Sequence, residues 1–144
     1  MATVGSLLRN REGEVMTIRS DATAQAAAML MNEARIGSLV VTDPKGGLIG
    51  IFTERDLLKR VVARDLLPHE VTVGDVMTDE VWTCSPQTPL DEVRLLMAER
   101  HIRHVPVLDE GRLLGMISIG DLNAARVTEM SATINYLEQF ITKM

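Results

Sequence analysis

The chain has 144 residues, of which 46% are hydrophobic, and its 15 basic and 20 acidic side chains give a net charge of −5. This hydrophobic content excludes a disordered chain, and the acidic balance argues against general nucleic-acid binding, which depends on neutralising phosphates. A single cysteine excludes an intrachain disulfide framework and fits a reducing cytoplasm. The apolar runs are too short to span a bilayer, and the N-terminus has no long apolar signal segment. We therefore expect a cytoplasmic protein with no membrane partner.

The first half of the chain predicts a strand, a helix, a hairpin and a second helix. A short strand is expected at 14–18, and residues 22–35 are dense in good helix formers. Residues 38–52, "SLVVTDPKGGLIGIF", place two β-branched runs around a turn, which predicts a hairpin. A second helix is expected to begin at Thr53.

The second half repeats this order after a connecting segment, 65–81, in which we expect one short helical turn at Val73–Met77. A strand is expected at 80–84 and a helix at 88–101. "HVPVLDEGRLLGMIS", residues 104–118, predicts a second hairpin, and another helix should begin at Ser118. Each half therefore reads β-α-β-β-α.

The two halves are also similar residue by residue. With an offset of 66, the matched pairs include Val15 with Val81, Ile36 with Ile102 and Asp43 with Asp109. After one residue is lost in the hairpin turn the offset is 65, and Gly50 then matches Gly115 and Asp56 matches Asp121. Such a small unit cannot bury its sheet alone, but two units packed sheet to sheet can. We predict an α/β fold of two pseudo-symmetric repeats, 1–65 and 66–144, with two equivalent clefts between them.

A long amphipathic C-terminal helix is expected after Asp121, because the rest of the chain contains neither proline nor glycine. Its apolar positions recur roughly every three to four residues: Leu122, Val127, Met130, Ile134, Leu137 and Ile141. This stripe either folds back on its own domain or packs on another subunit. We favour the second arrangement, and therefore a homodimer.

The same seven-residue phrase occurs in both halves, as "GIFTERD" at 50–56 and "GMISIGD" at 115–121. Thr53 with Asp56, and Ser118 with Asp121, have the spacing of a helix N-cap, which is the commoner use of this pattern. A helix start also suits a phosphate, and a carboxylate can accept from both hydroxyls of a ribose. The phrase therefore indicates a cap and, in addition, a nucleotide site. Its first glycine provides either steric relief in the sheet or close approach of a ligand.

This combination resembles a tandem pair of cystathionine-β-synthase-type (CBS) domains, the Bateman module, in its stand-alone bacterial form. The resemblance covers about residues 12–127 and rests on four segments: "VMTIRSDATAQAA", "RIGSLVVTDPKGGLIGIFTERDLL", "VWTCSPQTPLDEV" and "RHIRHVPVLDEGRLLGMISIGDLN". In this family each cleft takes its Asp phrase from one half and the strands that contact adenine from the other. The resemblance implies that the Asp holds the ribose and that the Ser or Thr lies near the ribose–phosphate.

Carried over by position, the resemblance implies two sets of nucleotide-binding residues. One set is Thr53, Asp56, Val81, Trp82, Ile102 and Arg103. The other is Ser118, Asp121, Val15, Met16, Ile36 and Gly37. Gly120 replaces a charged residue of the first phrase and gives the backbone room beside a ligand. Trp82 is interpreted either as a ring that stacks on the base or as a packed strand residue.

The two clefts should differ in charge. In families of this type a basic residue just before the hairpin strand often reaches the phosphates, which singles out Arg103 and His104. Gly37 and Ser38 are their uncharged counterparts in the first half. The cleft reached by Arg103 and His104 should therefore prefer the more charged ligand. Three further basic residues lie on the helix after Thr53, where a solvated surface is the safer interpretation: Arg55, Lys59 and Arg60.

The remaining candidates for chemistry are Cys84 and the three histidines, which lack the spacing of a metal site or a nucleophile with its base. We expect no metal, no catalytic cofactor and no enzyme activity. The predicted function is regulatory binding of an adenine nucleotide (AMP, ADP, ATP or NAD) by a homodimer, with a possible regulated protein partner that the sequence does not identify. The alternative is a protein-interaction or dimerisation module whose clefts are vestigial.

Overall fold

The computed structural model describes residues 2–8 and 15–142 of the chain. A short helix, α1 (Val4–Leu8), precedes the first repeat. The first repeat consists of β1 (Thr17–Arg19), α2 (Ala24–Ala34), β2 (Ser38–Thr42), β3 (Leu48–Thr53), α3 (Glu54–Asp56) and η1 (Leu57–Val62). The second repeat follows the short helix α4 (Val73–Val76) and consists of α5 (Leu90–Arg100), β4 (His104–Asp109), β5 (Arg112–Ser118) and α6 (Ile119–Thr142). Residue 14 of the predicted first strand lies outside the described residues.

The long helices of the two repeats end in the same way. Thr23 caps α2 by accepting a hydrogen bond from the Ala26 N–H at 3.0 Å. Helix α2 then ends at Arg35 and α5 ends at the equivalent His101, both in the left-handed conformation with φ of 56° and 54°. The repeat seen in the sequence is therefore a repeat of helix C-termini as well as of residues, whereas the N-cap of α5, Pro89, makes no side-chain cap hydrogen bond.

Each repeat contributes one small sheet. In the first, β1 pairs parallel to β2, and β2 pairs antiparallel to β3. In the second, β4 and β5 form an antiparallel hairpin. Both hairpins carry an irregularity at the same place, between Val41 and Thr42 and between Val107 and Leu108. The predicted α/β class and duplicated hairpins are confirmed.

The strand predicted at 80–84 is wrong, because only Cys84 makes a bridge there, parallel to Val107. In the first repeat the Val40 N–H donates to the Met16 carbonyl at 3.2 Å, next to the pairing of β1 with β2. The equivalent residues are Pro106 and Trp82, and proline has no N–H to donate. The parallel pairing is therefore not extended toward Trp82.

The buried residues form two clusters, one in each repeat. Helix α4, although it follows residue 66, contributes Val73 and Val76 to the first cluster. Helix α1, at the start of the chain, contributes the fully buried Val4 to the second cluster. The Val4 N–H donates to the Thr88 carbonyl at 2.9 Å, which ties α1 to the start of the second repeat. The two short helices therefore each pack on the repeat across the 65/66 division.

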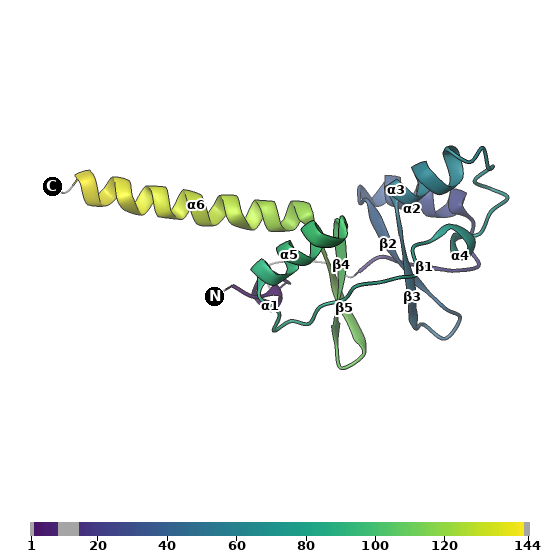
Figure 1. The fold of residues 1–144 in the computed structure, drawn as a ribbon, viewed down its shortest axis with the longest axis horizontal. Helices are drawn as coiled ribbons and strands as arrows, with labels where there is room; N and C mark the ends of the chain where they lie inside the picture. Colours follow the sequence, from purple (N-terminus) through teal and green to yellow (C-terminus); the bar gives the residue numbers. More distant parts are fainter. Residues whose placement is uncertain (1, 9–14, 143–144) are drawn as a thin grey trace.

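The two sheets lie next to each other in the middle of the molecule, with α2 and α4 on one outer side and α1 and α5 on the other (Figure 1). Helix α6 begins at the end of β5, packs on the second repeat through Leu122 and then extends away from both repeats. Its 24 residues span about 36 Å at 1.5 Å per residue. The predicted long C-terminal helix is confirmed. Among the described residues, no helix combines the length and apolar character that crossing a membrane requires.

Candidate functional site

Both copies of the seven-residue phrase form helix caps. The Asp56 N–H donates to Thr53 Oγ1 at 3.1 Å, and the Thr53 N–H donates to Asp56 Oδ2 at 3.0 Å. Ser118 and Asp121 make the same reciprocal pair, at 3.1 and 2.8 Å. These are capping boxes, in which each side chain pairs a backbone donor at the helix start that has no partner within the helix. The capping interpretation of the phrase is confirmed in both halves.

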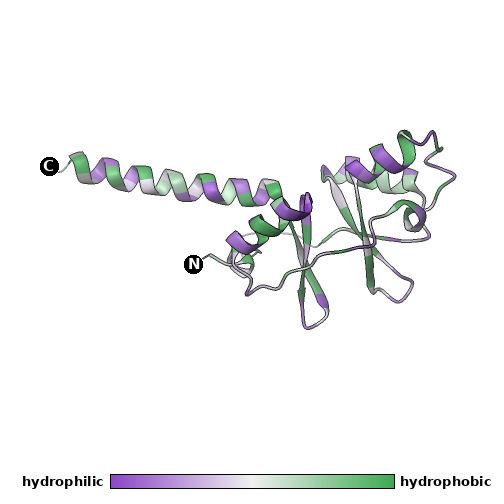
Figure 2. Ribbon diagram, viewed as in Figure 1, coloured by the Kyte–Doolittle hydropathy of each residue, from purple (hydrophilic) through white to green (hydrophobic). Residues whose placement is uncertain are grey.

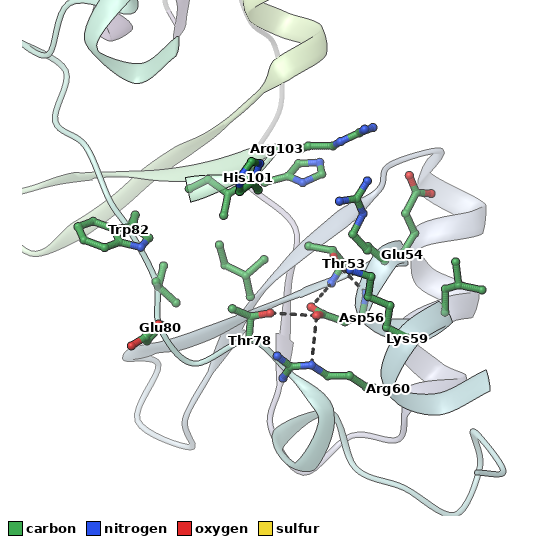
Figure 3. A pocket seen from close by; sticks show the side chains of 16 residues that line it. Thr53, Glu54, Asp56, Lys59, Arg60, Thr78, Glu80, Trp82, His101 and Arg103 are labelled. Atoms are coloured by element: carbon green, nitrogen blue, oxygen red, sulfur yellow. Dashed lines mark hydrogen bonds and ion pairs between the residues drawn. The ribbon is translucent and has the colours of Figure 1, made fainter. Parts of the chain in front are cut away.

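The carboxylate of Asp56 has partners beyond its own cap (Figure 3). Its Oδ1 atom accepts a hydrogen bond from Thr78 Oγ1 at 2.9 Å, and the Arg60 Nε atom lies 3.8 Å from the same oxygen. Thr78 reaches this position because the connecting segment pairs with the edge of β3, where Thr78 and Ile51 exchange two backbone hydrogen bonds of 2.9 Å. Asp56 is 7% exposed, so it is a buried carboxylate, and each of its two oxygens accepts one of these hydrogen bonds.

Asp56 lies on the wall of a cavity of about 400 Å³ between the two repeats, which we call the Asp56 cavity. The predicted residues that line it are Thr53, Asp56, Val81, Trp82, Ile102, Arg103 and His104. Residues from α3, η1, the connecting segment and the start of β4 therefore meet there. The structure brings this predicted set together in one place, and its role in nucleotide binding stays a prediction.

A second cavity, of about 590 Å³, contains Asp121 on its wall, and we call it the Asp121 cavity. The predicted residues that line it are Ser118, Asp121, Val15, Met16, Ile36, Gly37 and His104. Gly120 is not among the described residues that line it, and a Cβ atom there would meet only Ser118 Oγ, at 3.6 Å. The proposed contribution of Gly120 to a ligand site therefore has no support from its position.

The two cavities differ in charge. The Asp56 cavity has four cationic side chains on its wall, namely Arg55, Lys59, Arg60 and Arg103, against three carboxylates, Glu54, Asp56 and Glu80. The described wall of the Asp121 cavity has one arginine, Arg35, against one carboxylate. The sequence analysis interpreted the three basic residues after Thr53 as solvated surface: Arg55, Lys59 and Arg60. They are exposed or half-exposed, but they also line the cavity.

His104 lies between the two cavities and lines both. It opens β4, opposite Ser118 of β5, and is half-buried. Burial lowers the pKa of His104 from its ordinary value of 6.5, and the positive charge of Arg103 acts in the same direction. The negative charges of Glu54 and Asp121, which belong to the two phrases, act against this shift. A single imidazole therefore interacts with charged groups of both phrases.

Trp82 also lines the Asp56 cavity, but it is 41% exposed and belongs to no strand. Its interpretation as a packed strand residue is wrong. The guanidinium carbon of Arg100 lies 4.3 Å from the centroid of the indole ring, which is a cation–π contact. One face of the ring therefore already has a cationic neighbour.

The first glycine of the phrase provides steric relief. A Cβ atom on Gly50 would lie 2.5 Å from Met77 Sδ and 2.8 Å from the Thr78 carbonyl oxygen, so only glycine lets the connecting segment cross this strand. Gly115 makes the same allowance for Leu8, whose Cδ2 atom would lie 2.8 Å away. In each repeat the glycine admits a segment that comes from outside that repeat.

The described residues contain no cluster of three or more histidine, cysteine or acidic side chains suited to a metal ion. Cys84 is half-buried, and burial raises the pKa of its thiol to about 11. Its Sγ atom lies 3.8 Å from the Pro106 carbonyl oxygen. This environment favours a neutral, unreactive thiol.

Sequence reasoning missed Thr78, Glu80 and His101, which also line the Asp56 cavity. Thr78 was the hardest of these to find, because nothing in the connecting segment indicates where it crosses β3. A signal did exist in Gly50, since a glycine inside a strand marks the close approach of another backbone segment.

Comparisons with known proteins agree with this architecture. The mitochondrial CBS domain-containing protein CBSX3 of Arabidopsis thaliana is 33% identical over an alignment of 137 residues that covers 92% of this chain and 66% of that protein. The chain thus spans about two thirds of the length of this relative. A CBS-domain-containing protein of Agrobacterium tumefaciens is 38% identical, with a TM-score of 0.82, over 87% of this chain and 99% of that chain.

A protein with CBS domains from Burkholderia ambifaria, whose name assigns it to signal transduction, is 36% identical with a TM-score of 0.85. The comparison covers 88% of this chain and 95% of that one. The CBS domain model matches residues 4–63 and again residues 73–127. The chain therefore belongs to the CBS domain family, of which it carries two copies in tandem.

Proposed function

We propose that the chain is a regulatory module that binds an adenine nucleotide, such as AMP, ADP, ATP or NAD, in the Asp56 cavity. The observation that carries this proposal is the placement of one buried carboxylate and four cationic side chains on the wall of a single cavity between the repeats. The cavity volume of about 400 Å³ falls within the usual range for small-molecule sites.

In this proposal Asp56 binds the ribose. A carboxylate has about four lone-pair sites on its two oxygens. Oδ2 accepts from the Thr53 N–H and Oδ1 from the Thr78 hydroxyl, so each oxygen retains capacity for one hydroxyl of the sugar. Thr53 Oγ1 accepts the cap hydrogen bond from Asp56, which leaves its own O–H as a donor toward the ribose–phosphate.

The phosphates are assigned to Arg103, Arg55 and Lys59, which line the same cavity. Arg60 is assigned to the support of Asp56, because it lies 3.8 Å from that carboxylate and donates to the Met77 carbonyl. The base is assigned to the wall formed by Val81, Trp82 and Ile102. In the Asp121 cavity, with its single arginine, we propose a weaker site for a less charged ligand.

The proposed mechanism involves no chemistry on the nucleotide. A ligand that contacts both repeats favours the arrangement of the repeats to which it binds best, and thereby changes affinity for a regulated partner protein. We also propose that the chain works as a homodimer in the cytoplasm. Large apolar side chains on the outer helices, such as Leu58, Val62 and Leu95, are about 60% exposed. A similar CBS-containing protein of bloom-forming cyanobacteria is hexameric, which supports assembly in general.

Thermal unfolding with and without AMP, ATP, NAD and S-adenosylmethionine tests the proposal. A ligand at 100 times its Kd stabilises the folded state by about 2.7 kcal/mol, so the melting temperature should rise with at least one nucleotide. Substitution of Arg103 or Lys59 by alanine should weaken binding by about ten- to 150-fold, because a hydrogen bond to a charged group contributes about 1.5–3 kcal/mol. Arg112→Ala, at an exposed arginine outside both described cavity walls, is the matched control and should leave Kd unchanged.

The second candidate function is a protein-interaction module with vestigial cavities. It is favoured by the hydrogen bonds that already engage both oxygens of Asp56. The two functions give opposite results in one experiment: no thermal shift with any of these ligands at millimolar concentration would support the interaction module and contradict the nucleotide site.

A further inference from the structure

Helix α6 carries an apolar face that neither repeat covers. From Arg126 onward, every described side chain of α6 is exposed. The large apolar side chains Val127, Met130, Ile134, Leu137 and Ile141 are between 50% and 68% exposed. Figure 2 shows hydrophobic and hydrophilic segments alternating along this helix after it has left the repeats. Most of the stability of helices in proteins comes from the packing of an amphipathic face, so we expect this segment to pack on a partner surface.

The spacing of these five residues is three, four, three and four, which is a heptad pattern. Val127, Ile134 and Ile141 fall at position a, and Met130 and Leu137 fall at position d. When the heptad is continued toward the start of the helix, the fully buried Leu122 falls at position c. The a/d face, which we call the α6 seam, is therefore a different face from the one buried in the second repeat.

The residue types at the seam favour pairing with a second, parallel copy of the same helix. β-branched residues at a with leucine at d favour two parallel strands, and this seam has only valine and isoleucine at a and methionine and leucine at d. A two-fold symmetric dimer also requires a surface that is complementary to itself, and one a/d seam packs against an identical seam.

The hydrogen bonds and charges of the residues that flank the seam, at positions e and g, are compatible with burial of the seam. Thr133 lies at position g, and its hydroxyl already donates to the Glu129 carbonyl at 3.1 Å, so covering it leaves no unpaired donor. In a parallel pair Thr133 faces Glu138 at position e of the partner helix, and Arg126 at g faces Ser131 at e. No pair of like charges therefore meets across these positions.

Apart from Val127, at which the match to the CBS domain model ends, the seam also lies beyond the part of the chain that this model matches. We propose that α6 pairs with α6 of a second copy of this chain in a parallel, two-stranded coiled coil. The pairing places both modules at the same end of the coil. This inference rests on the homodimer of the proposed function and specifies its interface, and it is independent of nucleotide binding.

Disulfide cross-linking of single-cysteine substitutions tests the pairing directly. Met130→Cys and Leu137→Cys each place a thiol at a d position, and both positions can face their own copies only if the helices are parallel and in register. In an antiparallel pair at most one position near the symmetry axis can face itself. Under mild oxidation both variants should form covalent dimers at least about tenfold faster than Gln139→Cys, which lies on the outer face of the coil. Because burial raises the pKa of the Cys84 thiol to about 11, the unsubstituted chain should not cross-link.

A second pair of substitutions tests the seam without altering the thiols. Ile134→Glu in the Met130→Cys chain should slow cross-linking at least about tenfold, because it introduces charges at the centre of the seam. Ala132→Glu, on the outer face, should leave the rate unchanged. Light scattering of the unsubstituted chain separates the remaining outcomes. If the chain is a dimer but either d position fails to cross-link, the parallel coiled coil is wrong and the homodimer remains supported. If the chain is a monomer, both proposals are wrong.

Discussion

Asp56 has a capping role in the structure and a ligand-binding role in the proposed function, and the sequence analysis predicts both. Its capping box fixes the start of α3, and the bond from Thr78 fixes the orientation of the same carboxylate in the cavity. A buried carboxylate held from two directions loses little conformational entropy when a ligand binds to it. In the proposed function the cap would therefore also hold the carboxylate in the orientation that binds the ribose, so the capping and ligand-binding interpretations of the phrase are compatible.

His104 should make stability depend on pH. Burial lowers its pKa below the ordinary 6.5, so the folded state resists protonation while the unfolded chain does not. As the pH falls through 6.5, the unfolded state takes up a proton that the folded state does not bind, and the free energy of unfolding decreases. His104→Gln should remove this contribution, so its loss of stability between pH 7.5 and pH 5 should be smaller than that of the unsubstituted chain. Urea denaturation at several pH values measures the difference.

The control for this experiment is His69→Gln, because His69 is exposed and lies outside both described cavity walls. Its pH profile should match that of the unsubstituted chain. If His104→Gln and the unsubstituted chain lose the same stability as the pH falls, the buried imidazole has no part in the pH dependence.

At the scale of elements, the connecting segment crosses β3 only because Gly50 has no side chain. Gly50→Ala would place a Cβ atom 2.5 Å from Met77 Sδ and 2.8 Å from the Thr78 carbonyl oxygen, so the segment must move. We expect a loss of about 1–3 kcal/mol of unfolding free energy, the usual cost of overpacking. Because Thr78 also donates to Asp56, nucleotide affinity should fall with it.

Gly120→Ala provides the comparison, since it is the same substitution in the same phrase but in open space on a helix. A Cβ atom there would meet only Ser118 Oγ, at 3.6 Å. Alanine is favoured over glycine in helices by up to about 1 kcal/mol, so this variant should be neutral or more stable. Chemical denaturation of both variants measures the contrast, and equal effects would show that crowding at Gly50 is unimportant.

The repeat explains why most elements were predictable, whereas the two sets of cavity residues were predicted from the resemblance to the CBS family. The two halves predict the same elements at equivalent positions. A hairpin or helix that is inferred twice therefore depends on more than one local sequence pattern. The prediction failed where the halves differ: Val40 donates a hydrogen bond in the first repeat, whereas Pro106 cannot, and the strand at 80–84 is absent. The proline was visible in the sequence, but its effect depends on a long-range pairing that the local pattern around residue 82 does not contain.

At the scale of the whole molecule, the short helices before and after the first repeat both link the two cores. Helix α4 follows the first repeat and packs in its core, while α1 precedes it and packs in the core of the second. The chain therefore runs from the second core to the first and back again. Sequence reasoning placed the N-terminal segment with the first repeat, because a five-residue apolar helix carries no signal for which of two similar cores it joins.

Val4 tests whether α1 is an integral part of the second core. Its side chain is fully buried among Leu90, Val93 and Val105, so Val4→Ala removes two methyl groups from a packed site. We expect a loss of about 1–3 kcal/mol of unfolding free energy, measured by urea denaturation. Met29→Ala, at a side chain that is 55% exposed on α2, should change stability by no more than about 0.5 kcal/mol. Equal effects of the two substitutions would mean that Val4 contributes no more to stability than an exposed side chain, which would contradict an integral role of α1 in the second core.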